Sequence, residues 1–489
     1  MNIQPSFEEI QNLAKDYGAI PISMEILSDT VTPIQVLARL RQSSRHVYLL
    51  ESAEANKVWG RYSFLGFDPI IEVTAKNAVG RVLSKEGERS FSGDPAEEIR
   101  KLLLTHKSPV LSNLPPFTGG LVGHFSYDYI QYAEPTLHFT SDTEKRFRDA
   151  DFMMFDKVIA FDSYQQKIIL IVNLMTNTDE LRAAYDQTLQ TLEEIKRLIL
   201  ESPFQEAPSF TLQSPLAPIY DQTRYEQMVR KAKDYIKEGE IFQVVLSNRF
   251  EAKMEGSLLP AYRILRTTNP SPYMFYFSGD EGEIIGASPE TLVKKSGTQV
   301  TTFPLAGTRP RGETPEEDAC LEADLLADPK EVAEHNMLVD LGRNDLGKIC
   351  EVGSVTVEKY MNVERFSHVM HLGSCVSGKL AAGKDGLDCI QSVLPAGTLS
   401  GAPKIRACEI IDELEQDPRG IYGGAIGYFS FTQDMDFCIA IRLAYAKDGV
   451  VTVRSGAGIV ADSVPQNEFQ EVMNKAKAVK NALESASFT

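Results

Sequence analysis

The stretch "DFCIAIRLAYAKDGVVTVRSGAGIV", residues 436–460, contains two apolar runs joined at Lys447-Asp448-Gly449. Alternating apolar residues on both sides of such a turn predict a β-hairpin. On the first strand Arg442 shares a face with small residues, namely Cys438, Ala440 and Ala444. A recess above the sheet beside an arginine suits a carboxylate bound by both nitrogens, and a structural ion pair is an equally good interpretation.

The second strand of this hairpin carries the glycines of "SGAGI". Gly456 and Gly458 allow close approach of a ligand to the backbone, and a β-bulge would explain them equally well.

The rest of the chain alternates hairpin-like strand pairs with single helices. Residues 157–175 predict another hairpin, and helical spacing of apolar residues marks 178–200, 223–239 and the segment from Gln466 onward. This order favours an α+β fold with large, mostly antiparallel sheets over a parallel one. The proline-rich segment 206–221 is the best linker candidate, dividing the chain into residues 1–205 and 222–489.

Composition narrows the possible partners. The chain has 489 residues, 43% hydrophobic and 24% charged, with a formal net charge of −18. Such a balance is typical of a folded globular protein that repels nucleic acid and anionic membranes. The six cysteines form no CxxC pair, which predicts reduced thiols in a cytoplasmic protein. We expect neither a signal peptide nor a membrane span.

Two predicted helices carry paired glutamates beside an apolar stripe. "KEVAEHNMLVDLGRND" (330–345) holds Glu331 and Glu334, and "PQNEFQEVMNKAKAV" (465–479) holds Glu468 and Glu471. Glu471 and Lys475 could simply form a surface ion pair on one helix. Because both helices place acids at the edge of a buried face, a shared divalent cation, with Mg²⁺ favoured by oxygen ligands, is the sharper hypothesis.

Other motifs give weaker signals. A lone histidine such as His371 is by default a core residue, and "LPAGTLSGAPK" (394–404) lacks the spacing of a phosphate-binding P-loop. We find no glutaminase-like Gly-x-Cys-x-Gly segment and no Ser-His-Asp arrangement.

Several segments, taken together and in order, resemble the chorismate-utilising enzymes. They are "PLAGTRPRG" (304–312), "KEVAEHNMLVDLGRNDLG" (330–347), "HVMHLGSCVSG" (368–378), "LPAGTLSGAPKIRACEII" (394–411), "GIYGGAIGY" (420–428) and "RSGAGIVADSVPQNEFQE" (454–471). This family includes the large components of anthranilate and aminodeoxychorismate synthases and the isochorismate and salicylate synthases. The resemblance covers nearly the whole chain and implies a large four-layer α/β/β/α structure with orthogonally packed antiparallel sheets.

The resemblance also implies site residues. Glu334 and Glu471 would bind Mg²⁺, supported by Glu331 and Glu468, and the metal would bind the ring carboxylate of chorismate. Glu290, in "GASPE" (286–290), matches the family's general acid, assisted by His371. The remaining substrate contacts carried over are Thr398, Gly307, Thr308, Tyr422, Arg442, Gly456, Ala457, Gly458 and Lys475.

Three positions favour the anthranilate-forming members. Gln243 stands where the water-activating members have a lysine base, and an amide cannot deprotonate water, so ammonia is the expected nucleophile. Ala306 replaces the lysine nucleophile of the aminodeoxychorismate synthases, and the loop around Thr398 also differs from theirs. Aminodeoxychorismate synthase component I stays the alternative within the family, and a non-catalytic tryptophan-binding subunit is the alternative of another class.

The resemblance further implies partners and control. Without a glutaminase nucleophile, the chain is expected to pair with a glutamine amidotransferase subunit, as a heterotetramer of two plus two. "LLES" (49–52) and "NPSPYM" (269–274) resemble a tryptophan feedback site, with Ser52, Pro272, Tyr273 and Met274 carried over. Plain structural roles for these four residues are the competing interpretation.

Overall fold

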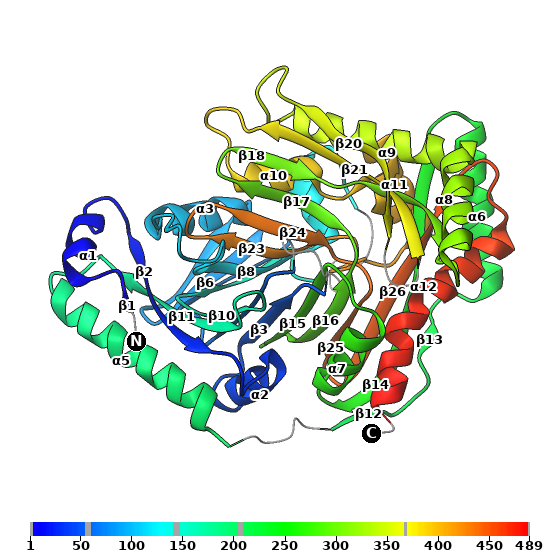
Figure 1. Ribbon diagram of the computed structural model, residues 1–489. Helices are drawn as coiled ribbons and strands as arrows, with labels where there is room; N and C mark the ends of the chain where they lie inside the picture. Colours follow the sequence, from blue (N-terminus) through cyan, green and yellow to red (C-terminus); the bar gives the residue numbers. More distant parts are fainter. Residues whose placement is uncertain (1–2, 54–59, 140–146, 204–208, 366–368, 488–489) are drawn as a thin grey trace.

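Two large antiparallel sheets form the centre of the protein. The structure is a computed structural model that describes residues 3–53, 60–139, 147–203, 209–365 and 369–487 (Figure 1). Within these ranges, fourteen strands form one sheet, here called sheet A, and twelve form a second, sheet B. All the strand pairs described are antiparallel, so the expected α+β class with antiparallel sheets is confirmed.

Sheet A runs, in spatial order, through β1 (Ile3–Gln4), β2 (Ala19–Leu27), β11 (Lys167–Met175), β10 (Lys157–Asp162), β4 (Tyr62–Phe67), β3 (Val47–Glu51), β15 (Tyr273–Gly279), β16 (Gly282–Ser288), β25 (Leu443–Lys447), β26 (Val450–Ile459), β14 (Gln243–Gly256) and β12 (Phe210–Leu212). The short strands β13 (Ala217–Pro218) and β22 (Gly401–Ala402) also pair with β14.

Sheet B runs through β19 (Leu305–Pro310), β21 (Val369–Lys379), β18 (Gln299–Thr302), β17 (Thr291–Ser296), β24 (Met435–Ile439), β23 (Ala425–Ser430), β8 (Gly120–Phe125), β9 (Ala150–Phe155), β5 (Ile71–Lys76), β6 (Val79–Ser84) and β7 (Gly87–Ser92). Strand β20 (Thr356–Arg365) pairs with β21 beside this path.

The two sheets pack face to face and helices cover their outer faces. The core between the sheets includes Tyr48 and Phe275 of sheet A and Val122 and Tyr428 of sheet B. The outer core of sheet A is packed by α2 (Pro33–Ser43), α5 (Leu181–Glu201), α6 (Gln222–Lys237), α7 (Leu259–Thr268), α11 (Lys404–Glu415) and α12 (Pro465–Ala486). That of sheet B is packed by α3 (Pro95–Thr105), α9 (Pro329–Gly347) and α10 (Gly386–Val393). The layers are therefore α/β/β/α, as expected.

The smaller helices lie beside these layers. They are α1 (Phe7–Leu13), α4 (Ile130–Ala133) and α8 (Pro315–Ala327). Apolar side chains of α8 pack with β21 in a small separate cluster that includes Leu325 and Leu372.

The predicted linker belongs partly to sheet A. Within 206–221, β12 and β13 pair with β14, and residues 206–208 lie outside those described. Both sheets also join strands from the two halves of the chain: β3 pairs with β15, and β8 with β23. The division at 206–221 stays a prediction, but the two halves do not have separate sheets.

Local signals position the two acidic helices. Asp328 caps α9 by accepting hydrogen bonds from the N–H groups of Lys330 and Glu331, and Pro329 occupies the first turn. Pro465 likewise occupies the first turn of α12. Both helices predicted from the apolar spacing are thus confirmed, and Figure 1 shows both toward the right of the view.

The chain crosses between the sheets at two neighbouring places. Residues 289–290 join β16 of sheet A to β17 of sheet B, and residues 440–442 join β24 of sheet B to β25 of sheet A. Three hydrogen bonds tie the crossings together. The Ala287 N–H donates to the Arg442 carbonyl at 3.1 Å, the Ile439 N–H donates to the Glu290 carbonyl at 3.0 Å, and Ser288 Oγ donates to the Ile439 carbonyl at 2.7 Å. We call this region the seam.

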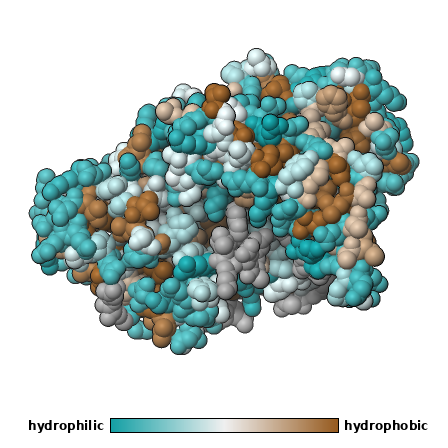
Figure 2. Space-filling view, turned by 45° about the horizontal axis from the view of Figure 1, so that its top comes forward, coloured by the Kyte–Doolittle hydropathy of each residue, from teal (hydrophilic) through white to brown (hydrophobic). Residues whose placement is uncertain are grey.

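The visible surface is mostly polar. Figure 2 shows hydrophilic side chains over much of one face, with apolar side chains gathered in separate patches. Among the helices described, none combines the length and apolar character needed to cross a bilayer.

A buried ionic network joins α11 to β14 and β26. Glu415 pairs with Arg419 at 2.6 Å and with Arg454 at 3.2 Å, and all three side chains are at most 4% exposed. Glu415 also accepts a hydrogen bond from the Ser247 N–H at 2.7 Å, and Arg419 donates to the Leu399 and Val245 carbonyls. Removing one partner would leave buried charge without compensation.

We therefore expect Glu415→Ala to lower the free energy of unfolding by about 3–5 kcal/mol. The control is Asp186→Ala, which removes the exposed pair between Asp186 and Arg182 on α5 and should cost less than about 1 kcal/mol. Urea unfolding followed by circular dichroism measures both. Equal losses in the two variants would contradict a special role for the buried network.

Candidate active site

Glu290 is a buried acid at the seam. It lies between β16 and β17 with 8% of its surface exposed, and Thr398 Oγ1 donates a hydrogen bond to its carboxylate at 3.1 Å. Burial raises its pKa to about 8, although Thr398, Lys475 and Arg442 all favour the ionised form. Near neutral pH this carboxyl is therefore mostly protonated, as a general acid requires.

Arg442 occupies the other crossing, which corrects a sequence expectation. The alternation predicted a single strand through 436–446, but β24 ends at Ile439 and β25 begins at Leu443 in the other sheet. Arg442 itself has a positive φ of 51°. The recess argument, based on neighbours along one strand face, is therefore wrong. The guanidinium nevertheless faces Glu290 closely enough to lower the pKa of that carboxyl.

His371 lies beside Gly307 and Thr308 of β19. Its Nδ1 is 2.7 Å from the Gly307 carbonyl oxygen and 3.1 Å from Thr308 Oγ1. Since a carbonyl can only accept, Nδ1 carries the proton. Burial lowers the pKa of His371, and the nearby charges of Arg442 and Lys475 act in the same direction, so the ring is neutral at pH 7.

The glycines of β26 make room for two side chains. A Cβ on Gly456 would lie 2.9 Å from the Tyr422 hydroxyl, and one on Gly458 would lie 2.9 Å from Gln243 Nε2. Strands β14 and β26 pair without a register shift through both glycines, so the bulge explanation is wrong. Gln243 is 3% exposed, and its Oε1 has no hydrogen-bond partner among the described residues.

The acidic helices α9 and α12 come within electrostatic range. Burial raises the pKa of Glu334, with Glu331 and Glu471 adding to the rise, and burial with Glu471 also raises the pKa of Glu468. Charges from α12 thus act on α9. Lys330 of α9 in turn lowers the pKa of Glu468.

The individual acids have different partners. Glu471 pairs with Lys475 at 2.7 Å, and Lys475 Nζ also donates to the Gly456 carbonyl at 3.2 Å. Glu331 lies 3.6 Å from Arg309 and packs against Gly307. The chemistry of this donor set fits Mg²⁺, because oxygen ligands crowded with like charge favour a hard divalent cation.

Several of the predicted site residues lie within electrostatic range of Lys475. Lys475 lowers the pKa values of Glu290, Glu334, Glu468 and His371, so a single cation links the seam to both acidic helices. Leu338 and Leu341 of the α9 apolar stripe line a small cavity together with Glu290 and Thr398. Ala457 lies between Gly456 and Gly458 and faces the outer core of sheet A, with no exposed surface.

Sequence reasoning missed the residues that support this arrangement. Arg419 holds the turn that contains Thr398 through the carbonyl of the next residue, Leu399, and holds β14 near Gln243 through the Val245 carbonyl. Arg454 could have been suspected, since a charged residue precedes the glycines within an otherwise apolar strand. Glu415 carries no local signal, because acids are ordinary near the end of a predicted helix.

The four residues assigned to feedback control also lie together. Ser52, Pro272, Tyr273 and Met274 line one cavity of about 110 Å³ between β3, β15, β23 and β24. Ser52 Oγ is buried there without a hydrogen-bond partner among the described residues. The Tyr273 hydroxyl lies 2.9 Å from Thr291 Oγ1 and donates to Asp436 at 2.8 Å. Thr291 directly follows Glu290, so this cavity adjoins the seam.

Comparison with known proteins identifies the family. Residues 45–481 match the chorismate binding enzyme family. Anthranilate synthase component 1 of Acetivibrio thermocellus is 44% identical over 99% of each chain, and that of Aquifex aeolicus (strain VF5) is 41% identical over 99% of each. The crystal structure of anthranilate synthase component I from Streptococcus pneumoniae TIGR4 aligns with a TM-score of 0.76 at 40% identity, over 93% of this chain and 99% of that one. With a family match over most of its length, end-to-end relatives and the same fold, the chain belongs to the chorismate-binding enzymes.

Proposed function

We propose that the chain is the large component of an anthranilate synthase, which converts chorismate and ammonia to anthranilate and pyruvate as the first step of tryptophan biosynthesis. The observation that carries the proposal is the environment of Glu290: a buried acid, protonated near neutral pH, beside Thr398 and facing two cations. Full-length similarity to proteins of that name supports the choice of product.

The proposed first step exchanges the ring hydroxyl for nitrogen. The protonated Glu290 gives its proton to the C4 hydroxyl, the C4–O bond breaks and water leaves, while the nitrogen of ammonia bonds to ring C2. Gln243 supports ammonia as the nucleophile, since its buried, unpartnered Oε1 can accept an N–H but cannot deprotonate water. His371 stays neutral and assists Glu290 in proton transfer.

The product of this step is 2-amino-2-deoxyisochorismate. Removal of its C2 hydrogen as a proton and cleavage of the C3–O bond then aromatise the ring and release the side chain as the enolate of pyruvate, which becomes pyruvate when its methylene carbon takes up a proton. Arg442 and Lys475 are the cations proposed to hold the substrate carboxylates, together with the Tyr422 hydroxyl, Thr308 and the backbone of Gly307, Gly456 and Gly458.

Glu334 and Glu471 would hold Mg²⁺, with Glu331 and Glu468 in support. When bound, the ion supplies positive charge for the ring carboxylate of chorismate, which an acidic protein otherwise repels. Lys475 pairs with one carboxylate oxygen of Glu471, which leaves the other oxygen for the ion.

We also propose a glutamine amidotransferase partner, in a heterotetramer of two plus two, and feedback inhibition by tryptophan. The cavity at Ser52 supports inhibition because its mostly apolar walls also carry charged residues and an unpaired buried hydroxyl, and because Tyr273 in its wall contacts Thr291, next to Glu290. We propose that a ligand bound there favours an inactive arrangement of the seam. Such feedback is a coupling free energy between two sites.

The purified chain with chorismate, Mg²⁺ and an ammonium salt should form anthranilate and pyruvate in equal amounts, identified by mass and by anthranilate fluorescence. Omitting Mg²⁺ should abolish turnover. Formation of aminodeoxychorismate or isochorismate would reassign the product, and no consumption of chorismate would favour a non-catalytic subunit.

Two variants on α12 serve as the matched pair for this assay. Glu471→Gln should lose activity because a metal ligand is neutralised, whereas Glu484→Gln removes an exposed acid at the far end of the same helix and should not. Retained activity in Glu471→Gln would remove the metal assignment.

Thr398→Val should shift the pH profile of kcat/KM. Glu290 acts in its protonated form, so activity falls as pH rises through its pKa of about 8. Since the Thr398 hydrogen bond lowers that pKa, its loss should move the alkaline limb to higher pH. Rates are measured at a constant concentration of free ammonia. If the alkaline limb of the profile does not move, Glu290 is not the titrating acid. As a second variant, Glu290→Gln should reduce kcat by roughly 10²-fold or more.

Ser52→Ala should weaken inhibition by tryptophan. A lost hydrogen bond of about 1 kcal/mol corresponds to roughly a fivefold higher Ki. The ratio of inhibited to uninhibited rate is measured across tryptophan concentrations for both proteins. Identical ratios in the two proteins would show that Ser52 does not contact the inhibitor.

A further inference from the structure

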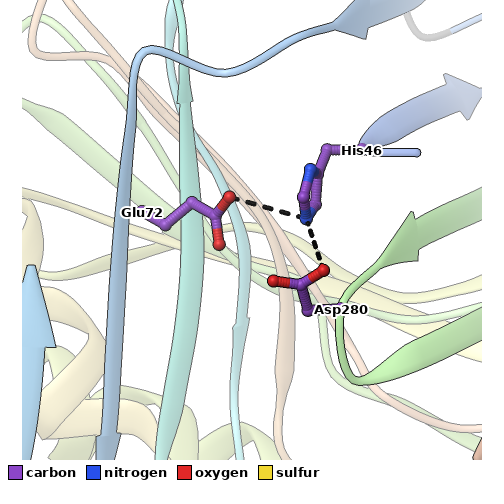
Figure 3. Close-up of side chains that lie close together, drawn as sticks. All are labelled: His46, Glu72 and Asp280. Carbon is purple, nitrogen blue, oxygen red and sulfur yellow. Dashed lines mark ion pairs between the residues drawn. The ribbon is translucent and has the colours of Figure 1, made fainter. Parts of the chain in front are cut away.

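A histidine and two carboxylates meet far along the chain from the acidic helices. His46 lies directly before β3, Asp280 lies in the turn between β15 and β16, and Glu72 is on β5. Their ligand atoms all lie within 4.8 Å of one another, and no other group of three or more such residues in the described part of the chain does so. Figure 3 shows both carboxylates directed at the same imidazole nitrogen.

The distances differ from those of a hydrogen-bonded ion pair. His46 Nε2 lies 3.5 Å from Glu72 Oε1 and 3.4 Å from Asp280 Oδ1, and it is buried without a hydrogen-bond partner among the described residues. A protonated imidazole would approach one carboxylate to about 2.8 Å. Two ligands on a tetrahedral ion with bonds of about 2.1 Å lie about 3.4 Å apart, which is the spacing seen here.

The surroundings hold the three ligands in place and leave room beside them. Ser44 Oγ donates to the His46 carbonyl at 2.9 Å, and a Cβ on Gly279 would touch the imidazole ring at 3.4 Å, so ring and turn are in close contact. The three residues line a cavity of about 50 Å³ that could supply a water as the fourth ligand. Glu72 is half-buried. Burial raises its pKa, Asp280 and Asp151 add to the rise, and His46 and Arg148 act in the opposite direction.

We propose that His46, Glu72 and Asp280 form a second metal site for a zinc-class divalent ion. An ion bound there would link sheet A to sheet B. An imidazole ligand selects a transition metal over Mg²⁺, and one histidine with two carboxylates neutralises a divalent charge. His46 and Asp280 flank strands of sheet A and Glu72 is on β5 of sheet B, so the ion would join the sheets away from the seam. Arg45, 3.6 Å from Asp280 and 68% exposed, is free to turn into solvent when the ion binds.

The test is calorimetric titration of the full chain with Zn²⁺ in excess Mg²⁺, which keeps the acidic helices occupied. Wild type should bind one more equivalent of Zn²⁺ than Glu72→Gln, His46→Gln or Asp280→Asn, or bind it with a Kd lower by roughly tenfold or more. Asp448→Asn, an exposed turn residue outside the group, is the control and should match wild type.

Co²⁺ provides an independent readout. A tetrahedral Co²⁺ spectrum in the visible range should appear with wild type and with Asp448→Asn, and be absent in the three ligand variants. Asp280 is 45% exposed, so Asp280→Asn keeps the test informative even if a more buried variant fails to fold. Equal stoichiometry, equal Kd and equal spectra across all five proteins would reduce the group to an ion pair and overturn the proposal.

Discussion

The active-site region depends on two places where the chain passes from one sheet to the other. Glu290 and Arg442 each lie at such a crossing, and backbone hydrogen bonds join the two crossings. Backbone outside regular strands must find partners for its N–H and C=O groups, and here each crossing supplies them to the other. The same arrangement leaves both side chains facing one another near the junction of the sheets, where a substrate can be held between two rigid layers.

Charge at this junction is balanced among a few neighbouring groups, of which Glu290 is buried and Lys475 is exposed. Burial alone would keep Glu290 protonated and His371 neutral, and the cations Arg442 and Lys475 limit the first effect and strengthen the second. The acidic helices have the opposite imbalance, because burial and the charge of Glu471 raise the pKa of both Glu334 and Glu468. A dianionic substrate would supply negative charge beside Arg442 and Lys475, and a divalent cation would supply positive charge beside the acids of α9 and α12.

The second cavity lies next to the first site, and the hydrogen bond between Tyr273 and Thr291 connects them. Cys438 of β24 and Tyr273 of β15 line it, and Thr291, which pairs with Cys438 in sheet B, follows Glu290 in sequence. A ligand that moves Tyr273 therefore acts on the residue next to the acid without any longer pathway. The cluster at His46 is a different kind of contact, since it connects the sheets away from the seam and shares no residue with either site.

Local pattern was sufficient for the elements that depend on local physics. The periodicity of residues 330–345, the hairpin at Lys447-Asp448-Gly449 and the acids on α9 and α12 were all predictable, because helix faces, turns and caps involve residues a few positions apart. The α+β class followed from the order of these elements, and the motif resemblance indicated which acids are candidate metal ligands and which is the candidate general acid.

The break at Arg442 was not predictable, because a strand alternates in the same way whether it stays in one sheet or changes to another. The contact of Glu415 with Ser247 and the meeting of His46 with Asp280 likewise join residues that are far apart in the sequence. Sequence thus determined what each segment forms. Only the packing of the two sheets decided which side chains share a buried, low-dielectric space, and that space sets their pKa values and their chemistry.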